Sequence, residues 1–256
     1  MTLAKPSVSG VIAAACLAAC LAVPRAEAAG RQPLADEPSR VEAQIGVLTS
    51  LVDSGLSEQA LQVLAQVRAQ GETDKRLDVL QARAMHATGM SDEARALLEG
   101  HVKRAPRDPA GWAALGIVLA DSGDLQGSLA ALEHARRLTP DDPVVLNNLG
   151  YARLSANQTE EAVRLFRASL TRDPSQPRTR NNLGFALARL ERDMEALQAF
   201  RAANPEADAR YNLGVACVNR GDRGTALTQF NAALDAAPGH PAAAAALDQL
   251  LSEATP

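Results

Sequence analysis

A repeat of 34 residues constrains the fold of this chain more than any other feature. Gly116, Gly150 and Gly184 follow one another at that interval, and Gly214 continues the series after only 30 residues. Twelve positions after each glycine, or after the equivalent Leu48 and Ala82, a column of small residues recurs: Ala60, Ala94, Ser128, Ala162, Ala196 and Ala226. A column of large apolar residues follows four positions later: Leu64, Leu98, Leu132, Phe166, Phe200 and Phe230. This periodicity predicts stacked repeats whose neighbours complete one another's core.

Within each repeat the residues predict two helices joined by a tight turn. Glycine stands at the turn in four repeats (Gly55, Gly89, Gly123, Gly221), and Asn157 and Glu191 replace it in the other two. Glycine adopts positive φ at little cost, so it suits such a turn. Proline, which cannot continue a helix, follows the second helix at Pro106, Pro140, Pro174 and Pro238. We expect the small residues to let the two backbones approach and the Leu/Phe column to fill the space between neighbouring hairpins.

These columns resemble the tetratricopeptide signature. Trp112-x2-Leu115-Gly116 matches its opening, and Ala162-x3-Phe166 followed by Pro174 matches its close. The resemblance implies an all-α, right-handed solenoid of about six helical hairpins plus a C-terminal capping helix. The expected repeats are 41–74, 75–108, 109–142, 143–176, 177–206 and 207–240, with the capping helix and tail at 241–256. The fifth repeat lacks four residues after Phe200, which predicts a shortened second helix.

The N-terminal residues 1–28 predict a secretory signal peptide. Residues 11–23 are apolar throughout, and this stretch is shorter than the roughly 20 residues that span a bilayer. Two interpretations compete. Leu17-Ala18-Ala19-Cys20 resembles a lipobox, which would make Cys20 the lipidation site. Ala26-Glu27-Ala28 instead favours cleavage after Ala28 and a soluble periplasmic protein. By resemblance, a lipidated form would be anchored in the bacterial outer membrane and face the periplasm. Residues 29–40 are expected to form a flexible tether.

Composition excludes several classes of function. The net charge of −4 gives no basic footprint for nucleic acid. The four histidines show no metal-ligand spacing, and neither a phosphate loop nor a nucleophile elbow is present. Beyond the signal region the sole cysteine is Cys217, which is expected to be an inert buried residue. The sequence therefore predicts a protein that is not an enzyme, needs no metal or cofactor, and contacts the membrane only through a lipid anchor.

The candidate partner-binding residues lie on the first helices of the repeats. Asn148, Asn182 and Asn212 stand two positions before the small residue of that helix, and they resemble the asparagine ladder in the groove of other tetratricopeptide proteins. An amide offers two donors and an acceptor to a peptide backbone. The predicted set also contains an aromatic pair to receive an apolar side chain, two arginines to bind an acidic one, and two more amides. These residues are Tyr151, Phe185, Arg178, Arg189, Asn147 and Asn181. The expected ligand is an extended peptide or a helix in the concave groove.

The C-terminal half resembles one family more specifically. The phrases NNLGFALA, ALQAFR and ARYNLGVACVNRGD, together with the shortened repeat, resemble TadD-type lipoproteins of tight-adherence (Flp) pilus assembly. That resemblance implies an envelope scaffold that contacts the outer-membrane secretin or other pilus components. Two alternatives stay open: an adapter for peptidoglycan enzymes and another pilotin-like assembly factor.

Overall fold

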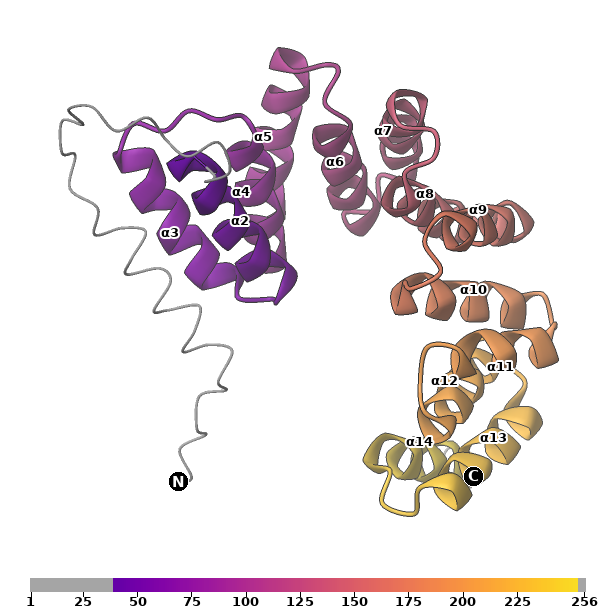
Figure 1. The fold of residues 1–256 in the computed structure, drawn as a ribbon. Helices are drawn as coiled ribbons and strands as arrows, with labels where there is room; N and C mark the ends of the chain where they lie inside the picture. The colour runs from indigo at the N-terminus through magenta and orange to yellow at the C-terminus, as the bar shows by residue number, and fades with distance from the viewer. Residues whose placement is uncertain (1–38, 253–256) are drawn as a thin grey trace, which may run out of the picture. The chain divides into compact units, whose positions relative to one another are not determined.

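The computed structural model describes residues 39–252, which form thirteen helices and no strand (Figure 1). The first helices of the six hairpins are α2 (Arg40–Asp53), α4 (Arg76–Ala87), α6 (Pro109–Asp121), α8 (Pro143–Ser155), α10 (Pro177–Arg189) and α12 (Glu206–Asn219). The second helices are α3 (Ser57–Ala69), α5 (Ser91–Arg104), α7 (Leu125–Leu138), α9 (Thr159–Arg172), α11 (Asp193–Arg201) and α13 (Arg223–Ala236), and α14 (Pro241–Ser252) follows them. The predicted fold class, an all-α array of helical hairpins, is confirmed.

Prolines mark the boundaries of the helices in two ways. Helices α5, α7, α9 and α13 each end two residues before the closing proline of their repeat. A different set of prolines begins α6, α8, α10 and α14, at the first helical position, where a missing N–H loses no hydrogen bond. At α8 the side chain of Asp142 also accepts a hydrogen bond of 2.8 Å from the backbone N–H of Val144. The connections are therefore short and fixed by local chemistry.

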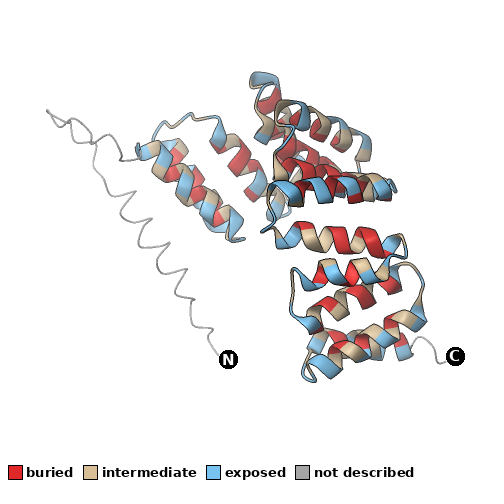
Figure 2. Cartoon of the chain, turned by 45° about the vertical axis from the view of Figure 1, so that its right-hand side comes forward, coloured by how far each residue is buried: buried red, intermediate tan, exposed pale blue. Residues whose placement is uncertain are grey.

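The described residues fall into two compact parts, an N-terminal part (39–118) and a C-terminal part (119–252), with the division inside α6. The core of the N-terminal part is aliphatic and is built by α2, α3 and α4, with Leu48, Leu64 and Leu77 fully or almost fully buried. The core of the C-terminal part centres on Phe166, Phe200 and Phe230. Leu250 of α14 belongs to that second core, so the last helix covers α12 and α13 as a cap. Figure 2 shows buried residues (red) interspersed with exposed residues (pale blue) along the helices.

In the C-terminal part each glycine of the repeat column faces the phenylalanine of its own hairpin. A Cβ atom built at Gly150, Gly184 or Gly214 would lie 2.7, 2.5 or 2.4 Å from the Cε1 atom of the paired ring. The partners are Phe166, Phe200 and Phe230. These glycines make room for an aromatic ring, whereas the sequence suggested that they serve backbone approach and that the ring fills space between hairpins.

The predicted turn column has a uniform backbone. Gly55, Gly89, Gly123 and Gly221 have φ between 74° and 88°. Asn157 and Glu191, the two departures from glycine, have φ of 62° and 60°. The turn therefore keeps its positive φ even where glycine is replaced. At Glu191 this is a left-handed conformation, which an L side chain disfavours by about 1–2 kcal/mol.

The fifth hairpin is shortened as expected: α11 has 9 residues, whereas α9 and α13 each have 14. The loop that follows α11 is held by α10. Asn204 donates from Nδ2 to Asn181 Oδ1 (2.6 Å) and to the carbonyl of Phe200 (2.9 Å), and Arg180 donates to the carbonyl of Ala202 (2.8 Å). Asn181 therefore fastens the shortened loop through its Oδ1 atom.

Trp112 is half-buried rather than part of the core, and its indole N–H donates to the carbonyl of Pro106 at 2.9 Å. None of the helices in residues 39–252 is long and apolar enough to cross a bilayer. The signal peptide, Cys20 and residues 29–38 of the tether lie outside the described residues. Of the remaining tether positions, Ser39 caps α2 and Arg40 begins it.

Candidate protein-binding site

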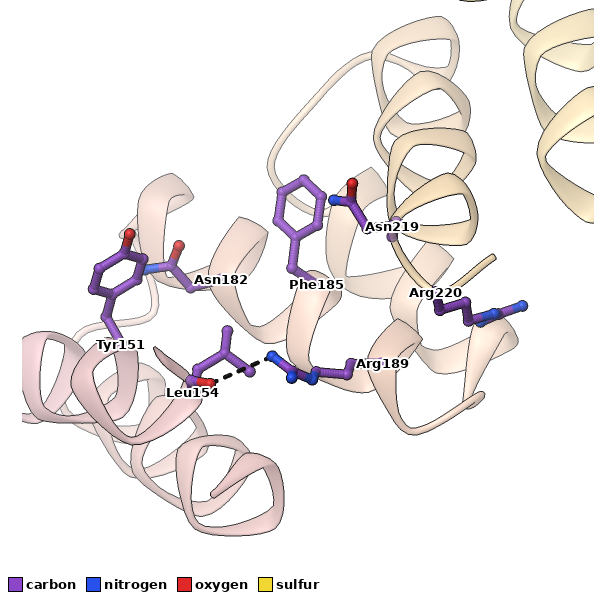
Figure 3. Close-up of a pocket in the computed structure, with 8 residues that line it drawn as sticks. Tyr151, Leu154, Asn182, Phe185, Arg189, Asn219 and Arg220 are labelled. Carbon is purple, nitrogen blue, oxygen red and sulfur yellow. Dashed lines mark hydrogen bonds between the residues drawn. The ribbon is translucent and has the colours of Figure 1, made fainter. Parts of the chain in front are cut away.

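A pocket of about 510 Å³ opens on three consecutive first helices, α8, α10 and α12 (Figure 3). This size falls within the range of about 300–1,000 Å³ typical of ligand sites. We call it the Tyr151 pocket, and its lining residues are Tyr151, Leu154, Asn182, Phe185, Arg189, Ala216, Asn219 and Arg220. Because each hairpin adds one such helix, the pocket follows directly from the stacking of the fourth, fifth and sixth hairpins.

Two aromatic rings provide the apolar surface of the Tyr151 pocket. Tyr151 is 45% exposed although it is a large side chain. Phe185 is half-buried and packs edge-on against the core ring of Phe200, with 5.0 Å between the ring centroids. Phe185 is thereby held in place by the core, while Tyr151 is open to a partner. The pair offers a surface on which an apolar side chain can be buried.

Arg189 supplies the positive charge near the aromatic pair. It is the last residue of α10, and its guanidinium donates to the carbonyl of Leu154 at 3.4 Å and to Asn157 Oδ1. Leu154 lies in the last turn of α8, where the partial negative charge of a helix favours a cation, and Asn157 lies in the turn that follows. The side chain is exposed, so an acidic group of a ligand has access to it.

The asparagines of the predicted ladder occupy different environments. Asn182 lines the Tyr151 pocket and donates from Nδ2 to Asn147 Oδ1 at 2.9 Å. Asn147 donates in turn to Asn148 Oδ1 at 3.2 Å. Asn147 and Asn148 are only 5% and 9% exposed. Asn182 is therefore accessible to a ligand, whereas Asn147 and Asn148 are buried.

Four of the residues predicted from sequence come together in the Tyr151 pocket: Tyr151, Asn182, Phe185 and Arg189. Asn212, which is half-buried, and Arg178, which is exposed at the start of α10, do not line it. Sequence reasoning missed Leu154, Ala216, Asn219 and Arg220. Helical spacing could have revealed two of them, because Leu154 follows Tyr151 by one turn and Asn219 follows Asn212 by two.

Comparison with known families settles the identity of the repeats. Sequence models described as tetratricopeptide repeat match residues 51–117, 147–204 and 194–241, together more than half of the chain. This chain belongs to the tetratricopeptide repeat family. Tetratricopeptide repeats act as protein–protein interaction scaffolds and are typically not enzymes.

Solved tetratricopeptide structures share the fold. YrrB, described as a TPR protein with an unusual peptide-binding site, is 20% identical with a TM-score of 0.52, and the match covers 72% of this chain and 97% of YrrB. TTC0263, a thermophilic TPR protein of Thermus thermophilus, is also 20% identical, with a TM-score of 0.55 and coverage of 70% and 99%. No protein in the curated set matches the chain.

One cluster in this tetratricopeptide chain has metal-ligand residue types: Asp193, Cys217 and Asp222 approach within 4.8 Å of one another. Arg220 already lies between the carboxylates and donates to Asp193 Oδ2 (2.7 Å) and Asp222 Oδ2 (2.9 Å). The hydrogen bonds with Asp193 raise the pKa of the Arg220 guanidinium. Burial raises the pKa of the Cys217 thiol to about 11, so the sulfur stays protonated at neutral pH. The cluster is therefore an ion pair beside an inert thiol.

The tripeptide Arg220-Gly221-Asp222 forms the turn between α12 and α13. The backbone N–H of Thr225 donates to Asp222 Oδ1 at 3.0 Å, which caps α13 and lowers the pKa of Asp222 to about 2. Asp222 therefore caps the second helix of the sixth hairpin, and Arg220 joins that hairpin to the fifth through Asp193 and the carbonyl of Ala188.

Proposed function

We propose that this protein is a non-enzymatic scaffold of the bacterial envelope that holds an extended segment of a partner protein in the Tyr151 pocket. The observation that carries the proposal is the exposed Tyr151 on α8 beside Phe185 and Arg189 on α10, in a pocket that α12 completes. The pocket is suited to an apolar side chain with an acidic group close by. Peptide binding described for YrrB is consistent with this use of the fold, although the chemistry proposed here depends on the residues of this chain.

The finer proposal is a role in assembling a tight-adherence pilus or secretion machine. It is supported by the predicted export signal and by the resemblance of the C-terminal half to TadD-type lipoproteins. The proposed location is the outer membrane, with Cys20 lipidated and the repeats in the periplasm. Under this proposal the partner is a secretin or another pilus component. The alternative partner is a peptidoglycan enzyme, for which the same pocket would serve.

Site-specific crosslinking in the native bacterium tests the pocket and identifies the partner in one experiment. A photoreactive amino acid replaces Tyr151, and captured proteins are identified by mass spectrometry. The control position is Met194, which is 74% exposed on α11 and does not line the pocket. We expect a partner captured at Tyr151 and not at Met194, and its loss when Arg189→Glu is added.

The identity of the captured protein separates the two roles. Secretin or pilus components, together with loss of surface pili in a deletion strain, would support pilus assembly. Capture of peptidoglycan hydrolases with normal piliation would favour the cell-wall adapter. Equal capture at Tyr151 and Met194 would count against the Tyr151 pocket as the binding site.

The state of the N-terminus is tested separately by mass spectrometry of the mature protein. An acylated Cys20 is the result expected for an outer-membrane anchor. A free Ala29 would replace that part of the proposal with a soluble periplasmic scaffold.

A further inference from the structure

The three asparagines around the Tyr151 pocket form a directional chain of hydrogen bonds. Asn182 Nδ2 donates to Asn147 Oδ1 (2.9 Å), and Asn147 Nδ2 donates to Asn148 Oδ1 (3.2 Å). The chain links α10 to α8, since Asn182 lies on α10 and the other two lie on α8. The amide of Asn182 is thus oriented by Asn147, and the amide of Asn147 is oriented by Asn148.

The burial of the three side chains shows which end of this chain meets a ligand. Asn147 is 5% exposed, so it does not reach a partner itself. Asn182 is half-buried and lines the Tyr151 pocket, where Figure 3 shows its amide between Tyr151 and Phe185. Because Nδ2 of Asn182 gives one of its two hydrogens to Asn147, Oδ1 is the one acceptor that this amide can offer to the pocket. That oxygen accepts no hydrogen bond within residues 39–252.

We infer that Asn147 is a positioning residue that fixes Asn182 as a hydrogen-bond acceptor, so that the pocket selects a peptide segment presenting a backbone N–H at this point. The inference rests on the proposed function and specifies its ligand chemistry. An acceptor next to an aromatic pair favours an N–H donor and disfavours a carboxylate at the same spot, because two acceptors repel. An acidic group of the ligand is then directed to Arg189 instead.

Substitution of Asn147 distinguishes positioning from a merely structural role. In Asn147→Asp, the carboxylate has only acceptors, so Asn182 must still donate to it and keeps its orientation. Asn148 can reverse its amide to donate to the new carboxylate, because its side chain makes no other hydrogen bond in the described part of the chain. In Asn147→Leu, a residue of similar size, nothing holds the Asn182 amide in one orientation.

The probe is a peptide selected on the full-length wild-type protein from a random library, provided that its binding is lost in Tyr151→Ala. The peptide is then synthesised with each backbone nitrogen methylated in turn, and affinities are measured for the wild type and both variants. We expect methylation at one position to weaken wild-type binding roughly three- to tenfold, the worth of a single hydrogen bond. The penalty should persist in Asn147→Asp and fall below about twofold in Asn147→Leu.

Several outcomes would overturn the inference. A methylation penalty that is equal in all three proteins, or absent from the wild type, would show that Asn147 does not set the acceptor, while the Tyr151 pocket would stand. A library that yields no Tyr151-dependent peptide would overturn both the inference and the proposed function.

A second measurement does not depend on the variants folding. The side-chain NH2 of Asn182 in the wild type should exchange its hydrogens slowly, both with and without the peptide, because it donates to a buried oxygen. Rapid exchange, or exchange that slows only when the peptide binds, would contradict the proposed orientation.

Discussion

The two parts of the molecule fill the same repeat columns in different ways. In the N-terminal part the corresponding columns hold Leu48 with Leu64 and Ala82 with Leu98, whereas in the C-terminal part glycine faces phenylalanine three times. The third repeat combines Gly116 with Leu132, so glycine on the first helix is not always matched by a larger residue on the second. The comparison teaches that phenylalanine on the second helix goes with glycine at the facing position, because a Cβ there would collide with the ring.

The parts also differ in how successive hairpins are joined. In the N-terminal part the buried ring of His101 lies between two carboxylates, with Nε2 at 2.8 Å from Asp108 Oδ2 and Nδ1 at 3.3 Å from Asp78 Oδ2. A Cβ atom at Gly111 of α6 would lie 2.5 Å from the same ring. In the C-terminal part, the aromatic core extends through the hairpins to α14. The N-terminal junction thus depends on polar groups that must stay paired.

The largest expected effect comes from removing that buried partner. His101→Leu should destabilise the N-terminal part by about 3–5 kcal/mol, because Asp78 and Asp108, only 15% and 13% exposed, lose a hydrogen-bond partner. Urea unfolding followed by the fluorescence of Trp112, the single tryptophan, reports on this part. The control Arg104→Ala removes an exposed partner of Asp78 and should cost about 1 kcal/mol or less. Equal costs for the two changes would contradict the proposed difference.

The next prediction tests whether Gly184 and Phe200 pack as one unit. Gly184→Ala places a Cβ against the ring of Phe200 and should cost about 1–3 kcal/mol. Adding Phe200→Leu recreates the Ala82–Leu98 pair of the second repeat. The double variant should therefore be more stable than the sum of the two single changes predicts, by about 0.5–3 kcal/mol. Simple additivity in a double-mutant cycle followed by circular dichroism would show that the pair is not the unit of packing.

Two buried serines of the C-terminal part should respond in opposite directions. Ser128 occupies the column that holds alanine in the other repeats, and its hydroxyl has no hydrogen-bond partner among residues 39–252. Ser169 donates to the carbonyl of Pro143 at 2.6 Å. We expect Ser128→Ala to stabilise and Ser169→Ala to destabilise, each by about 1 kcal/mol. Thermal unfolding measures both, and a loss of stability in Ser128→Ala would mean that its hydroxyl is satisfied.

The smallest effects concern the turns, which are glycine in the N-terminal part and Asn157 and Glu191 in two hairpins of the C-terminal part. Glu191→Gly should stabilise by up to about 1 kcal/mol, since glycine relieves the positive φ. Asn157→Gly should change stability less, because asparagine tolerates this conformation. Asn157→Gly also removes the Oδ1 atom that accepts a hydrogen bond from Arg189. We therefore expect this variant to change peptide binding more than stability. Chemical denaturation, combined with the peptide assay, separates the two variants.

The sequence predicted the architecture because the repeat columns are set by backbone geometry. The turn at Glu191 shows this, since Glu191 has the positive φ of its column although its residue type departs from glycine. The environments of Asn147, Asn148 and Asn181 were not predictable in the same way. Their hydrogen bonds run between hairpins and to the shortened loop, so they depend on the spacing of stacked helices. Trp112 fits the signature yet is half-buried, because the column does not specify how much of a large ring its neighbours cover.

The glycine–phenylalanine contacts have a consequence for how a chain of this kind can change during evolution. Each contact joins two helices of one hairpin, so a hairpin carries its own interlocking pair when the number of hairpins changes. The missing four residues of the fifth repeat fall after Phe200 and leave its pair with Gly184 whole. The number and length of hairpins can therefore vary while each glycine–phenylalanine contact is kept.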